Sequence, residues 1–126
     1  MAIENVIYQP QFDSHINDDR VIITLVNGAV PGFGSEHVRA IKFKRNTKLG
    51  NHWREYPEIY GIIGKAVFTL EDIETKEQIK YNLVTGDRLL IPPCVALKVE
   101  ASAGTIVLTC SQQSDRYQKT HKYDVL

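Results

Sequence analysis

The sequence predicts an all-β protein of the sandwich or barrel class. Short runs of β-branched and aromatic residues are separated by turn residues at modest intervals, which is typical of these folds. No segment has the periodicity of a long amphipathic helix, so parallel strands joined by crossover helices are not expected. Tight turns favour antiparallel pairing instead, and a double-sheet jelly roll satisfies the pattern.

The first predicted strands lie in the N-terminal third of the chain. Residues 21–26 form an apolar run that ends at Asn27-Gly28, and the Gly- and Pro-containing residues 31–35 form a loop. Residues 38–44 follow as a strand. Because side chains alternate along a strand, its lysine-bearing face is expected to meet water.

A hairpin is predicted in the middle of the chain. Residues 58–63 and 65–70 are its two strands, with Gly64 between them. Residues 71–77 carry dense mixed charge and are expected to form an exposed hairpin tip, which leads into a strand over residues 78–83.

The last strands are predicted around a proline break. Residues 88–91 form a strand that Pro92-Pro93 interrupts, and residues 96–100 resume it. Residues 105–110 form the final apolar strand. The polar tail 111–126 is compatible with a short helix, a strand or an extended arm.

Composition excludes several classes of function. The chain has 126 residues, which fits one domain, and its 15 basic and 15 acidic side chains cancel. This balance predicts no binding to nucleic acid or to an anionic membrane. The apolar runs are too short to span a bilayer and the first residues lack a signal-peptide pattern, so a cytoplasmic protein is expected. Cys94 and Cys110 are expected as buried thiols in a reducing compartment.

Two segments carry the candidate chemistry. The first is Gly50-Asn51-His52-Trp53-Arg54, followed by Glu58 and Gly64, and the second runs from Gly86 to Pro92, followed by Leu97. Together they resemble the paired motifs of the cupin family, in which two histidines and a glutamate of the first motif and a histidine of the second bind one metal ion inside a small β-barrel.

The resemblance implies a cupin-type double-stranded β-helix, a jelly-roll barrel. It implies one cupin domain over residues 1–126, with the barrel core at about 38–110, an N-terminal arm at 1–20 and a C-terminal tail at 111–126.

Two positions depart from the metal-binding pattern. Arg54 stands where the family carries its second histidine, and Leu97 stands where the second motif carries its histidine. A guanidinium has no lone pair to donate and repels a nearby cation, and leucine has no donor atom. No metal or other cofactor is therefore expected, and His52, Glu58 and Cys94 remain only weak candidate metal ligands.

If the strands pair as they do in cupins, five residues are expected around one cavity: His52, Arg54, Glu58, Tyr60 and Leu97. His52 is the candidate base and Tyr60 the candidate acid, whereas Arg54 suits an anionic ligand group. Glu58 is either an acid/base group or a carboxylate paired with a nearby arginine.

The remaining site candidates have structural alternatives. Arg88 is either a ligand-binding residue or the partner of Glu58. Tyr60, Trp53 and Tyr56 are expected to stack on a sugar or base, or to be core or interface aromatic residues. The alternative for His52 is a hydrogen-bonded histidine in a loop, and the alternative for Arg54 is an arginine that faces solvent.

The first functional hypothesis is a small-molecule-binding cupin, with a metal-independent isomerase or epimerase of a nucleotide-linked sugar as its specific form. The tail from Asp115 to Asp124 is similar to that of cupins that isomerise or epimerise keto-deoxysugar nucleotides. The alternatives are a non-catalytic sensor that binds a sugar-like or anionic ligand, and a metal-dependent cupin enzyme with atypical ligands. A homodimer is expected, with residues 6–12 lying across the sheet of a partner. The alternatives for this segment are a strand on its own barrel and a loose arm.

Overall fold

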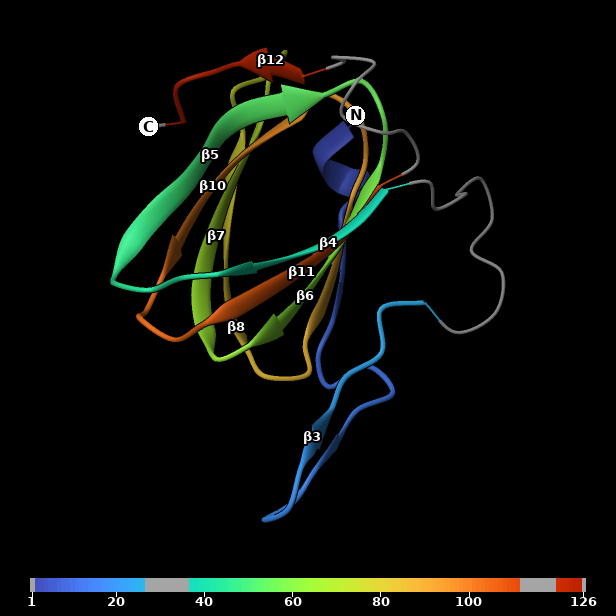
Figure 1. The fold of residues 1–126 in the computed structure, drawn as a ribbon. Coiled ribbons are helices and arrows are strands. Elements are labelled where there is room, and N and C mark those ends of the chain that lie inside the picture. The colour runs from blue at the N-terminus through green and yellow to red at the C-terminus, as the bar shows by residue number, and fades with distance from the viewer. Residues whose placement is uncertain (1, 27–36, 112–119, 126) are drawn as a thin grey trace.

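The predicted all-β class is confirmed. A computed structural model describes residues 2–26, 37–111 and 120–125, and Figure 1 shows strands wrapped into a barrel. Within these ranges the helical structure is a single 3-10 turn, η1 (Ala2–Asn5), and no helix is long and apolar enough to cross a membrane. The predicted loop at residues 31–35 lies outside the described residues.

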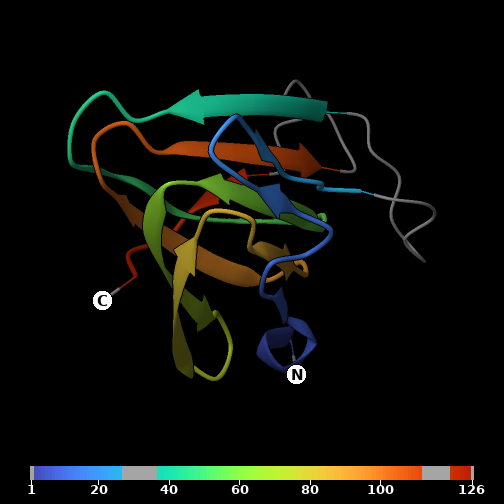
Figure 2. The same ribbon diagram turned by 90° about the horizontal axis from the view of Figure 1, so that it is seen from below.

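Two five-stranded antiparallel sheets enclose the core. The view from below shows the strands layered one above another (Figure 2). The first sheet contains, in spatial order, β1 (Ile7–Gln9), β9 (Arg88–Ile91), β6 (Glu58–Ile63), β11 (Ile106–Ser111) and β4 (His37–Lys42). The second contains β12 (Thr120–Lys122), β5 (Thr47–Arg54), β10 (Val95–Ala101), β7 (Lys65–Asp72) and β8 (Gln78–Val84). A separate hairpin pairs β2 (His15–Ile16) with β3 (Val21–Ile22).

Side-chain alternation explains which residues build the core. Tyr60 and Ile62 of β6 pack inward together with Leu97 and Val99 of β10. Burying a large apolar side chain contributes about 1.5–3 kcal/mol, so these inward rows hold the two sheets together. The core contains Phe43, Tyr60, Ile62, Ala66, Phe68, Leu70, Leu83, Leu89, Ile91, Val95, Leu97, Val99, Ala101 and Val107.

Strand β5 was not predicted. Its first half pairs with β10 through a register shift after Leu97, at which Gly50 has φ of 110° and Asn51 has φ of 56°. A Cβ atom at Gly50 would lie 2.6 Å from the Leu97 carbonyl oxygen, so only glycine fits this close approach. The irregularity sets His52 opposite Leu97.

The predicted hairpin tip at residues 71–77 is too long. β7 extends to Asp72, and both Glu71 and Asp72 are buried. The Asp72 carboxylate accepts hydrogen bonds from the backbone N–H groups of Ile3, Glu74 and Thr75, which offsets the cost of burying it. The exposed turn is consequently shorter.

The N-terminal arm is bound to its own barrel. β1 pairs with β9 of the same chain, which corrects the expectation that residues 6–12 lie across a partner. The buried Asp87 carboxylate fixes this arrangement, because it accepts hydrogen bonds from Tyr8 Oη and from the Gln11 and Val84 backbone N–H groups. The run predicted at residues 21–26 is a strand only at Val21–Ile22.

The C-terminal end is also docked. β12 pairs with the last residues of β5, so the part of the tail that the structure describes includes a strand. Cys94 is half-buried rather than buried, Cys110 is buried, and both are thiols.

Candidate functional site

A buried polar network links the end of β5 to the start of β6. Arg54, Glu58 and Tyr60 are 8%, 5% and 3% exposed. Arg54 Nη1 donates to Glu58 Oε2 and lies 3.5 Å from Tyr60 Oη, which donates to Glu58 Oε1 at 3.0 Å. Arg54 Nε donates to Thr120 Oγ1 at 3.0 Å. We call Arg54, Glu58 and Tyr60 the Arg–Glu–Tyr network.

Burial dominates the electrostatics of this network. It raises the pKa of Glu58, although the charge of Arg54, hydrogen bonds from Tyr60 and Arg54, and the charge of Arg39 act in the opposite direction. Both Glu58 oxygens accept hydrogen bonds, which is the pattern of an ionised carboxylate paired with a guanidinium. Burial and the neighbouring Glu58 raise the pKa of Tyr60 well above its usual value, so its phenol remains a proton donor at neutral pH.

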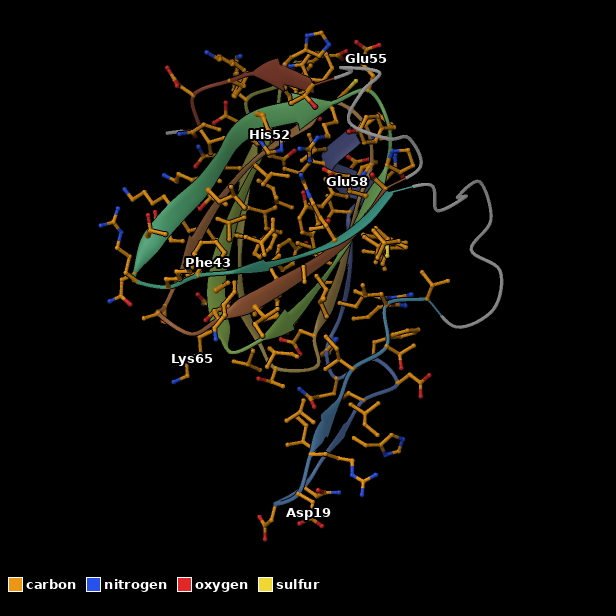
Figure 3. All side chains as sticks on the ribbon, viewed as in Figure 1. Asp19, Phe43, His52, Glu55, Glu58 and Lys65 are labelled. Atoms are coloured by element: carbon orange, nitrogen blue, oxygen red, sulfur yellow. The ribbon has the colours of Figure 1, made fainter. Side chains whose placement is uncertain are left out.

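His52 and Leu97 lie on the barrel side of the second sheet. Leu97 is 1% exposed within the core cluster that contains Tyr60, and His52 is its partner in the β5–β10 pairing. Opposed residues of an antiparallel pair share a face, and His52 shares its face of β5 with Arg54 by alternation. Figure 3 shows His52 and Glu58 toward the same end of the barrel.

Trp53 is separated from this group. Adjacent residues of a strand point to opposite faces, so Trp53 lies on the other face of β5 from His52 and Arg54. There it stacks on His121, with ring centroids 4.2 Å apart, and His121 Nε2 lies 2.5 Å from Glu55 Oε2. Tyr56 is buried, with the Arg54 guanidinium carbon 6.0 Å from its ring centroid.

Arg88 holds the N-terminal arm. Its Nε donates to Gln9 Oε1 at 2.6 Å, its Nη1 donates to the Leu25 carbonyl at 2.7 Å, and its guanidinium carbon lies 3.4 Å from the Phe12 ring centroid. Leu89 and Ile91 face the core, so Arg88 points to the outer face of the first sheet. Of the two arginines considered as partners of Glu58, the structure selects Arg54.

The residues do not fit the metal site that the fold family suggests. Within the described ranges, no three His, Cys, Asp or Glu side chains are arranged to hold a metal ion. Glu58 is paired with Arg54, and Leu97 offers no donor. The Cys94 backbone N–H donates to the Arg54 carbonyl, but burial and the nearby Glu74, Asp72 and Glu55 raise the pKa of its thiol, which disfavours a thiolate ligand.

Arg39 is a residue that the motifs did not reveal. The register aligns Arg39 of β4, Thr109 of β11 and Tyr60 of β6 in one row, and Tyr60 faces the core. Alternation within residues 38–44 was the available signal, because Arg39 has the same parity as Ile41 and Phe43, which contact or belong to the core.

Comparison with known proteins identifies the fold. No protein-family model and no curated protein sequence matches the chain. Among solved structures, a dTDP sugar isomerase from Desulfovibrio desulfuricans G20 has a TM-score of 0.81 at 13% identity, over 96% of this chain and 85% of that chain.

Two further structures support this result. The 3,4-ketoisomerase QdtA from Thermoanaerobacterium thermosaccharolyticum, in complex with TDP, has a TM-score of 0.74 at 17% identity, over 92% of this chain and 86% of that chain. WlaRA, a TDP-fucose-3,4-ketoisomerase from Campylobacter jejuni, has a TM-score of 0.68 at 17% identity, over 95% and 90% of the two chains. The protein therefore has the cupin jelly-roll fold that these sugar isomerases share. Identities this low establish the fold and not the activity.

Proposed function

We propose that this single-domain cupin isomerises or epimerises a nucleotide-linked sugar or related carbohydrate without a metal ion. The observation that carries the proposal is the position of His52 on the same barrel face as the Arg–Glu–Tyr network. The fold shared with three sugar isomerases supports the substrate class. A site that combines a few polar groups with apolar walls such as Leu97 suits a small organic ligand.

The proposed chemistry is proton transfer next to a sugar carbonyl. His52 removes a proton from the carbon beside the carbonyl, and the Tyr60 phenol turns its O–H from Glu58 Oε1 to the oxygen that gains negative charge. Epimerisation results when a second acid, or water, delivers a proton to the opposite face of the same carbon, and His52 then loses its proton to solvent. Moving the abstracted proton to the carbonyl carbon, while a hydroxyl proton moves between the two oxygens, gives isomerisation. Neither reaction requires an oxidant or reductant.

Arg54 and Arg39 account for recognition of an anionic group. The charges of both guanidinium groups act on the single carboxylate of Glu58, so this end of the barrel is electrostatically suited to an anion. Arg54→Leu is expected to weaken binding of TDP by roughly tenfold to a thousandfold, because a charge-assisted hydrogen bond contributes a few kcal/mol.

A His52→Gln variant tests the catalytic role. With TDP-4-keto-6-deoxyglucose as probe, His52→Gln is expected to abolish turnover and to retain affinity within a few-fold, because only the base is lost. His121→Gln is the matched control, since His121 lies on the outer face against Trp53. Turnover by His52→Gln at the wild-type rate would contradict the assignment of the base.

A non-catalytic binding protein is the second candidate. It is favoured by the Arg–Glu–Tyr network, whose three side chains already satisfy one another through hydrogen bonds. In that case the wild type binds a nucleotide-linked sugar, shown by a thermal shift, but converts none of the candidate substrates.

The proposal includes a cytoplasmic homodimer. The two thiols support a reducing compartment. Exposed apolar side chains on the β2–β3 hairpin support association, because such surfaces on soluble proteins commonly mark contacts.

A further inference from the structure

The β2–β3 hairpin, residues 15–22, projects from one end of the barrel (Figure 1). Every residue from 15 to 22 is exposed, so both faces of this two-stranded ribbon meet solvent. Ile16, Val21 and Ile22 are 52%, 41% and 45% exposed. An isolated two-stranded ribbon is marginally stable in water, and three exposed aliphatic side chains add a cost that a covering surface removes.

The tip of the hairpin is negatively charged. Asp18 and Asp19 form its tip, where the Asn17 side chain accepts hydrogen bonds from the backbone N–H groups of Asp19 and Arg20. These contacts define the turn and leave two carboxylates beside the apolar strands, against the one cation of Arg20. A surface that receives this hairpin therefore needs cationic groups next to apolar ones.

A groove of about 570 Å³ on the second sheet has that chemistry. Its lining includes Lys48, Lys65, Val67, Asn82, Val84 and Glu100. Val67 and Glu100 are opposed in the β7–β10 pairing, and their neighbours Ala66 and Ala101 face the core, so the groove lies on the outer face of the sheet. We call it the Lys48–Lys65 groove.

Position separates this groove from the candidate active site. The groove crosses the ends of β5, β10, β7 and β8, and none of the residues of the Arg–Glu–Tyr network lines it. Figure 3 shows Lys65 toward the end of the barrel from which the hairpin extends to Asp19, with His52 toward the other end. The groove and the hairpin thus occupy the same part of the molecule and are open to a second copy.

We infer that the β2–β3 hairpin of one copy docks in the Lys48–Lys65 groove of a second copy. Asp18 and Asp19 face Lys48 and Lys65, and the hairpin's aliphatic side chains cover Val67 and Val84. A two-fold axis makes the contact twice, which doubles the area buried by one small hairpin. The inference rests on the homodimer proposed above and names its two surfaces.

Charge reversal tests the pairing. Asp18→Lys/Asp19→Lys and Lys48→Glu/Lys65→Glu are each expected to raise the dimer dissociation constant at least tenfold, measured by sedimentation equilibrium. Combining all four changes is expected to restore it to within about threefold of wild type, because each contact again joins opposite charges. Glu77→Lys and Lys122→Glu are matched controls, since both residues are exposed and neither lines the groove: Glu77 directly precedes β8, and Lys122 of β12 pairs with His52.

A carbodiimide cross-link identifies the contact directly. In a mixture of unlabelled and ¹⁵N-labelled protein, mass spectrometry is expected to find Asp18 or Asp19 joined to Lys48 or Lys65 in peptides of mixed isotope. Far-ultraviolet circular dichroism of each variant checks that the barrel is intact.

These experiments distinguish failure of the proposed homodimer from failure of the proposed docking surfaces. A wild-type monomer at micromolar concentration overturns the homodimer and with it the docking. A dimer that both reversals leave unchanged, or that the combined variant does not restore, overturns only the surfaces named here. Loss of TDP binding in the lysine variants, with an unchanged dimer, assigns the groove to a small ligand instead and also overturns the inference.

Discussion

At the scale of single residues, Arg54 distinguishes this site from the metal-binding motif that the sequence resembles. The motif that the sequence resembles has a metal-binding histidine at this position, whereas the guanidinium here pairs with Glu58 inside the barrel. A buried ion pair has a desolvation cost that hydrogen bonds must offset, and Tyr60 and Thr120 supply them. Arg54 thus offers no metal ligand at this position and instead forms the Arg–Glu–Tyr network.

Glu58→Gln measures how strongly the network depends on this pairing. The change leaves the buried Arg54 without its opposite charge, so we expect the free energy of unfolding to fall by about 3–5 kcal/mol. Urea unfolding at neutral pH gives this value. The double variant Arg54→Met/Glu58→Leu should recover most of the loss, since neither charge is then buried alone.

The exposed Glu77→Gln is the matched control, with an expected change within about 0.5 kcal/mol. A Glu58→Gln protein as stable as wild type would show that the ion pair contributes nothing to the fold.

Sequence reasoning placed some site residues and misplaced others for a physical reason. Glu58 and Tyr60 follow from alternation within one strand, and Arg54 follows from its distance along the motif. Placing Arg88 requires the pairing register between β6 and β9, in which Arg88 lies opposite Gly61 rather than Tyr60. Cross-strand register depends on tertiary pairing, and a shift of one residue moves a side chain to the other face.

At the scale of elements, β6 and β9 have the bounds that their apolar runs predict, whereas β5 was missed. Gly50-Asn51 at the centre of β5 is a turn signal in isolation. In the fold these residues form a register irregularity between β5 and β10, and the strand continues because β10 and β12 pair with it. Tertiary pairing here overrides local propensity.

Both ends of the chain are fixed by carboxylates at the end of β7. Hydrogen bonds from the backbone N–H of Glu74, and also of Thr75 and Ile3, lower the pKa of Asp72. The hydrogen bond from Tyr123 Oη, with further help from Gln78 and Lys76, lowers the pKa of Glu71. A lowered folded-state pKa means that each carboxylate stabilises the fold fully above its ordinary pKa of 3.8 or 4.5 and loses this effect as pH falls through the folded value.

We therefore expect acid to loosen the termini. The free energy of unfolding should decrease as pH falls below these ordinary values, and the protection of the Ile3 amide against hydrogen exchange, relative to the intrinsic rate at each pH, should fall first. Asp72→Asn should reduce the slope of this decrease, whereas Asp124→Asn, at an exposed position, should not. Equal slopes in wild type and Asp72→Asn would show that Asp72 is not a source of the acid sensitivity.

At the scale of the whole molecule, the jelly roll was predictable because its signals are repeated along the chain. Strand length, turn residues and the two motifs agree on one topology, and agreement between independent levels is what specifies a fold. The projecting hairpin was not predictable, since the apolar run at residues 21–26 reads as a strand whether or not it joins the barrel. Its exposure is visible only in three dimensions.

The central claim is that the end of the barrel around His52 and the Arg–Glu–Tyr network binds a nucleotide-linked sugar. A crystal structure of the protein with TDP-4-keto-6-deoxyglucose tests it most directly, because it locates the ligand without assuming turnover. We predict the sugar within reach of His52 and Tyr60, with an anionic group of the nucleotide toward Arg54 or Arg39. A ligand bound only in the Lys48–Lys65 groove, or no bound ligand at saturating concentration, would contradict the account.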